Sequence, residues 1–373
     1  MNGEGPPRAT PLAHKLAVRI ARDGPIGVDE YMQACLQDPE HGYYRRQTAI
    51  GRAGDFVTAP EISQVFGELV GLWCAVVWQQ MASPQAVRLI ELGPGRGSLM
   101  RDALRAARLV PAFRAALRVE LVESNAALEP IQRATLSGDD VPLRWSADIL
   151  SGAGPVIVIA NEFIDTLAAA QWVFRAGSWR ARCVGLDPAG NLAFVDGAPH
   201  AGLKLPPGTP EPGDGDIFEE RTAALAGFAD KLAALGAPLA ALFIDYGHTR
   251  SGFGDTLQAV QAHRHTDPLQ SPGEADLTSQ VDFAAFAAAM RARGFACDGP
   301  VAQGEFLGRL GITERASRLM AANPAKAAQI EVDIARLTAP GGMGGRFQAI
   351  GIRSPQLAAL PALEAVDTTT GSP

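Results

Sequence analysis

From residue 87 onward, short apolar runs rich in β-branched residues alternate with helical patterns, and this alternation constrains the fold more than any other feature. Strands are expected over 87–91, 118–122, 156–160 and 239–245, and helices over 99–108, 125–136, 219–235 and 283–293, the last capped by Asp282. The run from Val156 to Ala160 is apolar throughout, which is typical of a strand buried on both faces. The pattern predicts an α/β fold with a mainly parallel, doubly wound, Rossmann-like sheet.

The segments around this sheet predict a helical extension and two insertions. Helices are expected over 11–21, after Asp29 and over 65–81. The predicted organisation is a helical N-terminal extension over 1–85, a sheet domain over 86–353 with insertions at about 171–216 and 247–283, and a tail over 354–373. The short runs over 171–195 indicate antiparallel strands, whereas 247–283 has little regular pattern and is expected to cover a substrate.

Composition and charge exclude several classes of protein. The net charge of −7 comes with no basic stripe, which disfavours nucleic acid as a partner. No stretch of 18 uncharged apolar residues exists, so no transmembrane segment is expected. The 4 cysteines are far apart, so we expect neither a disulfide framework nor a metal site, and a reducing cytoplasmic location. The N-terminus resembles neither a secretory signal nor a transit peptide.

A glycine loop follows the first expected strand. Its sequence runs from Glu91 through Gly93, Pro94, Gly95 and Gly97, at a turn from strand to helix. Dinucleotides and S-adenosylmethionine both bind at such turns, but Ser98 stands where the dinucleotide fingerprint requires glycine or alanine. Proline has no N–H to offer a phosphate, whereas an acid directly before the glycines suits the cationic ammonium and sulfonium of S-adenosylmethionine. The loop therefore predicts S-adenosyl-L-methionine as the cofactor.

Two further strand ends carry polar side chains. Glu123 closes the second expected strand, where a carboxylate can accept hydrogen bonds from ribose hydroxyls. Asn161, Glu162 and Asp165 follow the third strand, at the edge where ligands bind in open α/β sheets. Amide and adenine methyltransferases carry an Asn-Pro-Pro-aromatic run at this place, and the prolines are absent here. The alternative is that these polar groups only cap a following helix.

Nearly the whole chain resembles the MidA family of S-adenosylmethionine-dependent methyltransferases. The resemblance rests on Pro39-Glu-His-Gly-Tyr-Tyr44, Gly54-Asp-Phe-Val-Thr-Ala-Pro-Glu-Ile-Ser63, Glu91–Gly97, Val122-Glu-Ser124, Asn161–Asp165, Asp245-Tyr-Gly247 and Pro272-Gly-Glu-Ala-Asp-Leu-Thr278. The family run usually continues after Asp165 as Ala-Leu-Pro, whereas this chain has Thr166-Leu-Ala168. Another departure is Pro340-Gly-Gly-Met-Gly-Gly-Arg-Phe347, where the family favours Leu-Phe-Lys.

The family includes a mitochondrial complex I assembly factor that methylates protein arginine. The resemblance therefore implies a protein arginine methyltransferase with a complex I subunit as its partner. Glu162 and Asp165 are the first candidates for gripping the guanidinium, with Asn161 orienting it, and Asp245 with Tyr246 come second. The expected cofactor-binding residues are Gly54, Thr58, Pro60, Glu61, Glu91, Gly93, Gly95, Gly97, Glu123 and Asn161.

Other interpretations stay open at this point. A small-molecule methyltransferase, another protein methyltransferase and a nucleotide-using reductase are the rival enzymes, and the missing glycine argues against the reductase. A cofactor-binding assembly chaperone without essential catalysis is the rival outside enzymes. The acceptor, the pattern of methylation and the oligomeric state, including a homodimer, are also open.

Overall fold

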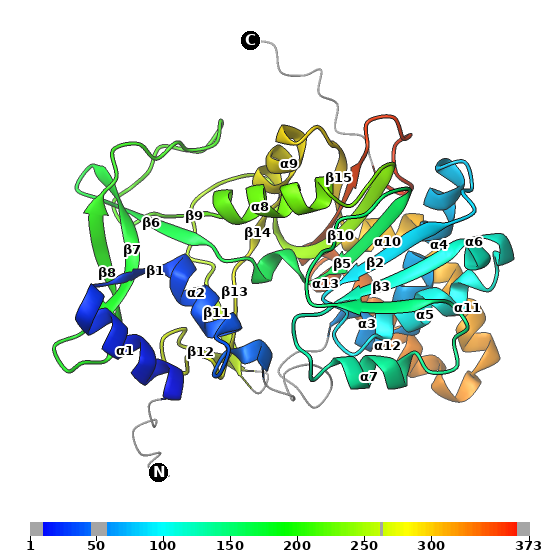
Figure 1. Ribbon diagram of the computed structural model, residues 1–373, viewed down its shortest axis with the longest axis horizontal. Coiled ribbons are helices and arrows are strands. Elements are labelled where there is room, and N and C mark those ends of the chain that lie inside the picture. The colour runs from blue at the N-terminus through cyan, green and yellow to red at the C-terminus, as the bar shows by residue number, and fades with distance from the viewer. Residues whose placement is uncertain (1–9, 46–57, 262–263, 364–373) are drawn as a thin grey trace. The chain divides into compact units, whose positions relative to one another are not determined.

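The computed structural model describes residues 10–45, 58–261 and 264–363 (Figure 1). The chain divides into two compact units, each built from three stretches. The first unit contains Met1–Phe56, Asp165–Leu225 and Arg250–Gln280, and the second contains Val57–Ile164, Ala226–Thr249 and Val281–Pro373. The expected N-terminal extension over 1–85 is thus shared between the units.

The second unit is built on a mostly parallel sheet with strand order β15-β16-β10-β5-β2-β3-β4. The strands are β2 (Val87–Leu92), β3 (Leu117–Val122), β4 (Leu143–Ser146), β5 (Val156–Asn161), β10 (Leu239–His248), β15 (Ala296–Ala302) and β16 (Phe347–Arg353), and the short β14 (Val281–Asp282) pairs with β10. Within this series only β16 is reversed, and it pairs antiparallel with both of its neighbours, β10 and β15. The predicted doubly wound α/β sheet is confirmed.

Helices pack on both faces of this sheet. On one face α4 (Gln64–Gln80) and α5 (Ser98–Ala107) share a core with β2, β3, β5 and β10. On the other face, Phe228 of α8 (Thr222–Ala233) and Phe286 of α9 (Phe283–Ala292) contact Phe243 of β10, with ring centroids 5.7 and 5.1 Å from it. Asp282 caps α9 as expected, because its side chain accepts a hydrogen bond from the Ala285 N–H.

Several elements of the second unit lie outside the expected pattern. They are β4, the strands β15 and β16, and the helices α3 (Ala59–Ile62), α6 (Pro111–Ala116), α10 (Gln303–Arg309), α11 (Ile312–Ala322), α12 (Ala327–Thr338) and α13 (Met343–Arg346). The expected helix over 125–136 is shorter and forms α7 (Glu129–Thr135). Most of these elements are short, and short elements depend on long-range partners more than on local pattern.

The first unit carries an antiparallel sheet of order β1-β7-β6-β9, with β8 also paired to β7. Its strands are β1 (Ile26–Gly27), β6 (Ala170–Arg175), β7 (Ser178–Leu186), β8 (Leu192–Pro199) and β9 (Ile217–Glu220). The antiparallel strands expected over 171–195 are confirmed. The expectation that a helix begins at Glu219 is wrong, because Ile217–Glu220 pairs with β6 and the helix starts at Thr222.

The segment 247–283 contains regular structure, which corrects the expectation of an irregular loop. It forms β11 (Gln258–Gln261), β12 (Arg264–Thr266) and β13 (Asp276–Thr278), a three-stranded sheet of order β12-β11-β13. The N-terminal helices hold this segment within the first unit. The Thr10 hydroxyl, at the start of α1 (Pro11–Asp23), donates to the Pro272 carbonyl, and Tyr31 of α2 (Val28–Gln37) donates to the Pro268 carbonyl.

Arg221 ties together three segments of the first unit. Its buried guanidinium donates to the backbone carbonyls of Leu167, Gln280 and Ser279 at 2.9, 2.8 and 2.7 Å.

No helix in the described part of the chain is long and apolar enough to cross a membrane.

Candidate cofactor and active site

The carboxyl ends of the parallel strands meet at one edge of the second unit's sheet. Leu92, the last residue of β2, is in register with Val122 of β3 and Ala160 of β5. Ile244 of β10 is in register with Asn161 of β5. The loops that follow β2, β3 and β5 therefore begin side by side, and β10 runs past the end of β5 to His248. Because β3 and β5 flank β2, the strand order reverses at β2. This is the place at which open α/β sheets bind ligands.

The glycine loop leaves β2 through backbone conformations that favour glycine. Gly93, Gly95 and Gly97 have φ values of +62°, +53° and +82°. The Gly93 N–H donates to the Val122 carbonyl at 3.0 Å, which anchors the loop to the end of β3. A Cβ atom on Gly93 would lie 3.3 Å from the Phe163 ring, so this glycine allows the loop to approach the turn after β5.

Glu91 is a buried carboxylate just below this loop. Its side chain is 2% exposed, and its Oε2 atom has no hydrogen-bond partner among the described residues. Burial raises the pKa of Glu91 to about 8, against a hydrogen bond from the Met100 backbone, and the charge of Glu123 adds to the rise. A cationic ligand would pair with Oε2 of Glu91 and favour the ionised form of this carboxyl group. Glu91 and the glycine loop therefore fit the ammonium of S-adenosylmethionine.

Glu123 lies at the end of β3, where it was expected. Its Oε1 accepts a hydrogen bond from the Asn125 N–H at 2.8 Å, and its Oε2 accepts one from Gln132 at 3.2 Å. Burial raises the pKa of Glu123 to about 7, although these hydrogen bonds oppose the rise. A carboxylate held in this way is suited to accept hydrogen bonds from a ribose.

Gln132 of α7 is a site residue that sequence reasoning missed. It is fully buried, and its Nε2 donates both to the Gly95 carbonyl at 2.8 Å and to Glu123. Its Oε1 accepts a hydrogen bond from Trp145 Nε1 at 2.9 Å. Gln132 thus links the glycine loop to the acid after β3. No motif marks it, since a glutamine on a short helix is most often exposed.

A short helix upstream of the sheet contacts the glycine loop. Thr58 is the N-cap of α3, and Pro60 and Glu61 lie in its first turn. The Glu61 carboxylate accepts a hydrogen bond from the Ser98 hydroxyl at 2.5 Å, at the residue that begins α5. Gly54 lies outside the described residues. The predicted cofactor-binding roles of these four residues stay predictions.

The turn after β5 carries the candidate acids in a strained backbone. Glu162 has a φ of +53°, a left-handed conformation that is uncommon for residues other than glycine and is often found at functional sites. Asn161 Nδ2 donates to Glu162 Oε1 at 3.0 Å, while the buried Asn161 Oδ1 has no hydrogen-bond partner among the described residues. Asp165 is buried on η2 (Ile164–Thr166), at the point where the chain passes into the first unit.

Asp245, at the carboxyl end of β10, shapes this turn. It is 1% exposed, and its Oδ2 accepts hydrogen bonds from the backbone N–H groups of Phe163 and Ile164 at 3.1 and 2.8 Å. Its neighbour Tyr246 packs on the ring of Phe347, with centroids 5.6 Å apart. These contacts indicate that Asp245 positions the turn that holds Glu162.

A doubly wound sheet, a glycine loop at its reversal point and a buried acid before that loop together define an S-adenosylmethionine-dependent methyltransferase. Residues 69–301 match the model of a family described as S-adenosyl-L-methionine-dependent methyltransferases. The chain belongs to this family, and its resemblance to the MidA methyltransferases is confirmed.

Curated relatives and solved structures agree with this assignment. "Protein arginine methyltransferase NDUFAF7, mitochondrial" from Danio rerio is 34% identical over 362 residues, covering 89% of this chain and 84% of that protein. The human protein of the same name is 33% identical, with 91% and 82% covered. A Burkholderia thailandensis protein crystallised with S-adenosyl-homocysteine has a TM-score of 0.84 and 27% identity, with 96% and 97% of the two chains covered. S-adenosylmethionine is the cofactor.

Proposed function

We propose that this methyltransferase transfers a methyl group to an arginine side chain of a protein. The observation that carries the proposal is the acidic turn after β5, where Glu162 stands in a strained conformation that Asp245 supports. The relatives named protein arginine methyltransferase, which align with about nine-tenths of the chain, support the same acceptor.

The chemistry of arginine explains why acids are needed. A guanidinium is always protonated and its lone pairs are delocalised, so it is a poor nucleophile. A carboxylate can bind two of its nitrogens at once and concentrate the positive charge away from the third nitrogen. In this proposal Glu162 and Asp165 bind the guanidinium, and Asn161 orients it. The acids also fix the direction in which the free nitrogen points, which is the main requirement of an in-line displacement.

The cofactor supplies the electrophilic methyl group when it is bound. In our proposal Glu91 holds its ammonium, the backbone of Gly93, Gly95 and Gly97 lies against it, and Glu123 accepts hydrogen bonds from its ribose. Asn161, whose buried Oδ1 has no hydrogen-bond partner among the described residues, lies at the same edge of the sheet. Gly54, Thr58, Pro60 and Glu61 are proposed to cover the cofactor.

We further propose that the acceptor is a subunit of respiratory complex I, and that its methylation supports assembly of the complex. The support is the MidA resemblance, which includes an assembly factor of that complex. The names of the curated relatives place those proteins in mitochondria. All four cysteines of this chain are free thiols, which fits a reducing compartment such as the cytoplasm proposed from the sequence.

The isosteric variants Glu162→Gln and Asp165→Asn test the acceptor site. Each keeps the shape of the side chain and removes one charge, so turnover should fall by about 10²-fold or more while cofactor affinity is kept. The measurement is methyl transfer from labelled cofactor to complex I subunits, with calorimetry for S-adenosylhomocysteine. Glu305→Gln, at a half-exposed acid on α10, is the matched control.

A second arm replaces the modified arginine of the acceptor by lysine, which should abolish methylation because an ammonium must lose a proton before it can attack. Normal turnover in both isosteric variants, or equal methylation of the lysine acceptor, would contradict the proposal.

A further inference from the structure

The connection between β4 and β5 lacks a helix. Residues 147–155 form no regular element, although a crossover between parallel strands usually contains a helix that covers one face of the sheet. Phe228 of α8 and Phe286 of α9 pack on Phe243 of β10, over a different part of that face. The side chains that β2, β3 and β4 direct to this face therefore indicate which kind of molecule could bind there.

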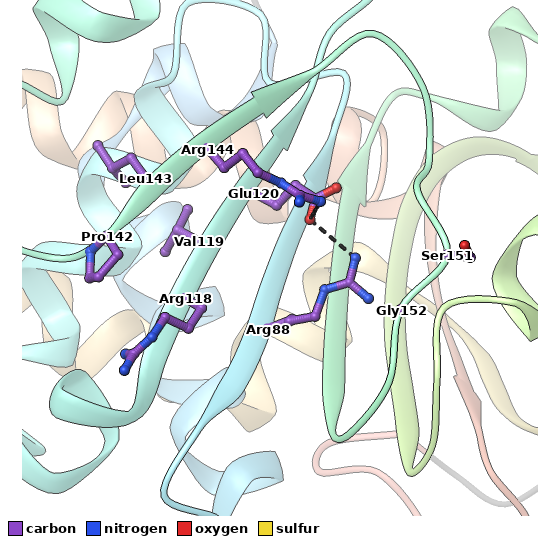
Figure 2. A pocket seen from close by; sticks show the side chains of 9 residues that line it. All are labelled: Arg88, Arg118, Val119, Glu120, Pro142, Leu143, Arg144, Ser151 and Gly152. Carbon is purple, nitrogen blue, oxygen red and sulfur yellow. Dashed lines mark hydrogen bonds and ion pairs between the residues drawn. The ribbon is translucent and has the colours of Figure 1, made fainter.

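Near the amino ends of these strands, three of these side chains are arginines. Arg88 of β2 is in register with Arg118 of β3, and Glu120 of β3 is in register with Arg144 of β4. In-register neighbours share a face, as do residues two apart on one strand, so all four lie on the same side of the sheet. They line a hollow with a volume of about 350 Å³ together with Val119, Pro142, Leu143, Ser151 and Gly152 (Figure 2).

Glu120 and Arg88 form the fixed floor of this hollow. Glu120 is buried and accepts hydrogen bonds from Arg88 at 3.1 Å and from Arg144 at 2.8 Å. Arg88 also donates to the carbonyls of Leu235 and Leu150, so its guanidinium is held in place. The single negative charge of the hollow is therefore already paired twice.

Arg118 and Arg144 keep donors for another molecule. The Arg144 side chain is 56% exposed, and within the described chain only its Nη2 has a hydrogen-bond partner. Arg118 is exposed, and in the part of the chain that the structure describes only its Nη1 has partners, the carbonyls of Leu117 and Ala115. The lining holds three guanidinium groups and one carboxylate, a local excess of two positive charges in a chain with a net charge of −7.

We propose that this hollow docks an acidic segment of a partner protein. Guanidinium groups bind carboxylates in pairs of parallel hydrogen bonds, and the positive excess is complementary to aspartate and glutamate. In Figure 2 the guanidinium of Arg118 points away from that of Arg144, so one small anion does not reach both. An extended acidic segment, which carries carboxylates along its length, can contact both. The negative net charge of the chain disfavours nucleic acid.

The surface is separate from the proposed cofactor site. Arg88, Arg118 and Arg144 are each the second residue of their strand, whereas the cofactor loops follow the carboxyl ends of β2 and β3. A partner bound here leaves the carboxyl edge of the sheet open. Docking should therefore act on affinity for a protein and leave cofactor binding unchanged.

The test measures binding of a fluorescein-labelled (Glu-Ala)₄ peptide at low salt by anisotropy. The double variant Arg118→Ser/Arg144→Ser should lower the peptide affinity by about tenfold or more, because it removes both exposed guanidinium groups. The matched control Arg22→Ser/Arg293→Ser removes two exposed arginines elsewhere and should change the affinity by less than about threefold. S-adenosylhomocysteine affinity verifies that both variants are folded.

Three further probes identify the occupant. A (Gln-Ala)₄ peptide should bind at least about tenfold more weakly to the wild-type protein, and neither inorganic phosphate at 1 mM nor an oligo(dT) of equal charge should displace the acidic peptide. The proposal is overturned if the double variant binds the acidic peptide as the wild type does. It is equally overturned if glutamine replaces glutamate without loss, or if phosphate or DNA displaces the peptide.

Discussion

At the scale of single residues, Gln132 connects the parts of the proposed cofactor site. One buried amide contacts the Gly95 carbonyl, the Glu123 carboxylate and the Trp145 indole. A buried polar group with all its partners rigidifies its surroundings, whereas loss of one member leaves the others without partners. Gln132 is therefore expected to set the position of the glycine loop relative to the acid after β3.

The variant Gln132→Leu tests this role. It keeps the approximate volume and removes three hydrogen bonds, one of them to a charged group, so affinity for S-adenosylhomocysteine should fall by about tenfold or more. Ser137→Ala, at an exposed hydroxyl two residues beyond α7, is the control. Calorimetry gives both affinities, and an unchanged value for Gln132→Leu would mean that the loop holds its shape without this side chain.

At the scale of elements, α4 and α5 pack with almost no space between their backbones. Cβ atoms built on Gly67 and Gly71 would lie 2.7 Å from the Asp102 Cβ and 2.6 Å from the Ala103 Cα. Because α5 begins at the end of the glycine loop, the approach of α4 fixes the helix that follows this loop. Glu68 of α4 adds ion pairs with Arg105 and Arg315, at 2.9 and 2.7 Å.

The variant Gly71→Ala should destabilise the protein by about 1–3 kcal/mol, because the added methyl group meets backbone that cannot move without separating the helices. Gly227→Ala on α8 is the matched control. Nothing lies within 4 Å of its Cβ position, so the same substitution should be neutral or stabilise by about 0.5–1 kcal/mol. Urea unfolding measures the free energy of unfolding of both variants. Equal changes would show that the close packing of α4 on α5 does not cause the loss of stability.

At the scale of the whole molecule, two buried acids make both stability and ligand affinity depend on pH. Burial raises the pKa of Glu91 to about 8 and that of Glu123 to about 7, from an ordinary value of 4.5. Between about pH 4.5 and 8 the unfolded chain has released protons that the folded, ligand-free protein keeps. The free energy of unfolding should therefore fall as pH rises across this window.

Ligand binding should release protons in the same window. The proposed ionic contact of Glu91 with the cofactor ammonium requires the carboxylate form, so near pH 7 binding should expel on the order of one proton per ligand. Calorimetry in buffers of different ionisation enthalpy measures this number. Glu91→Gln should abolish most of it, and identical binding enthalpies in all buffers for the wild type would contradict the ionic contact.

Local sequence decided the architecture of the sheet and the positions of the two acids proposed to hold the cofactor. The strands over 87–92 and 156–161 and the helix that Asp282 caps follow from apolar period and capping chemistry, which act over a few residues. Glu91 stands out in the sequence because it directly precedes the glycines, and Glu123 because it closes a buried strand.

Tertiary structure alone decided the contacts and short strands that join residues far apart in the sequence. Gln132 meets Gly95 across 37 residues, and Asp245 meets Ile164 across 81, and neither pairing has a local signal. The short strands β9 and β11 to β13 exist because neighbouring strands satisfy their backbone hydrogen bonds, so their own sequences show no strand period. The arginine-lined hollow likewise arises only from the register of β2, β3 and β4, which brings together side chains that the sequence separates.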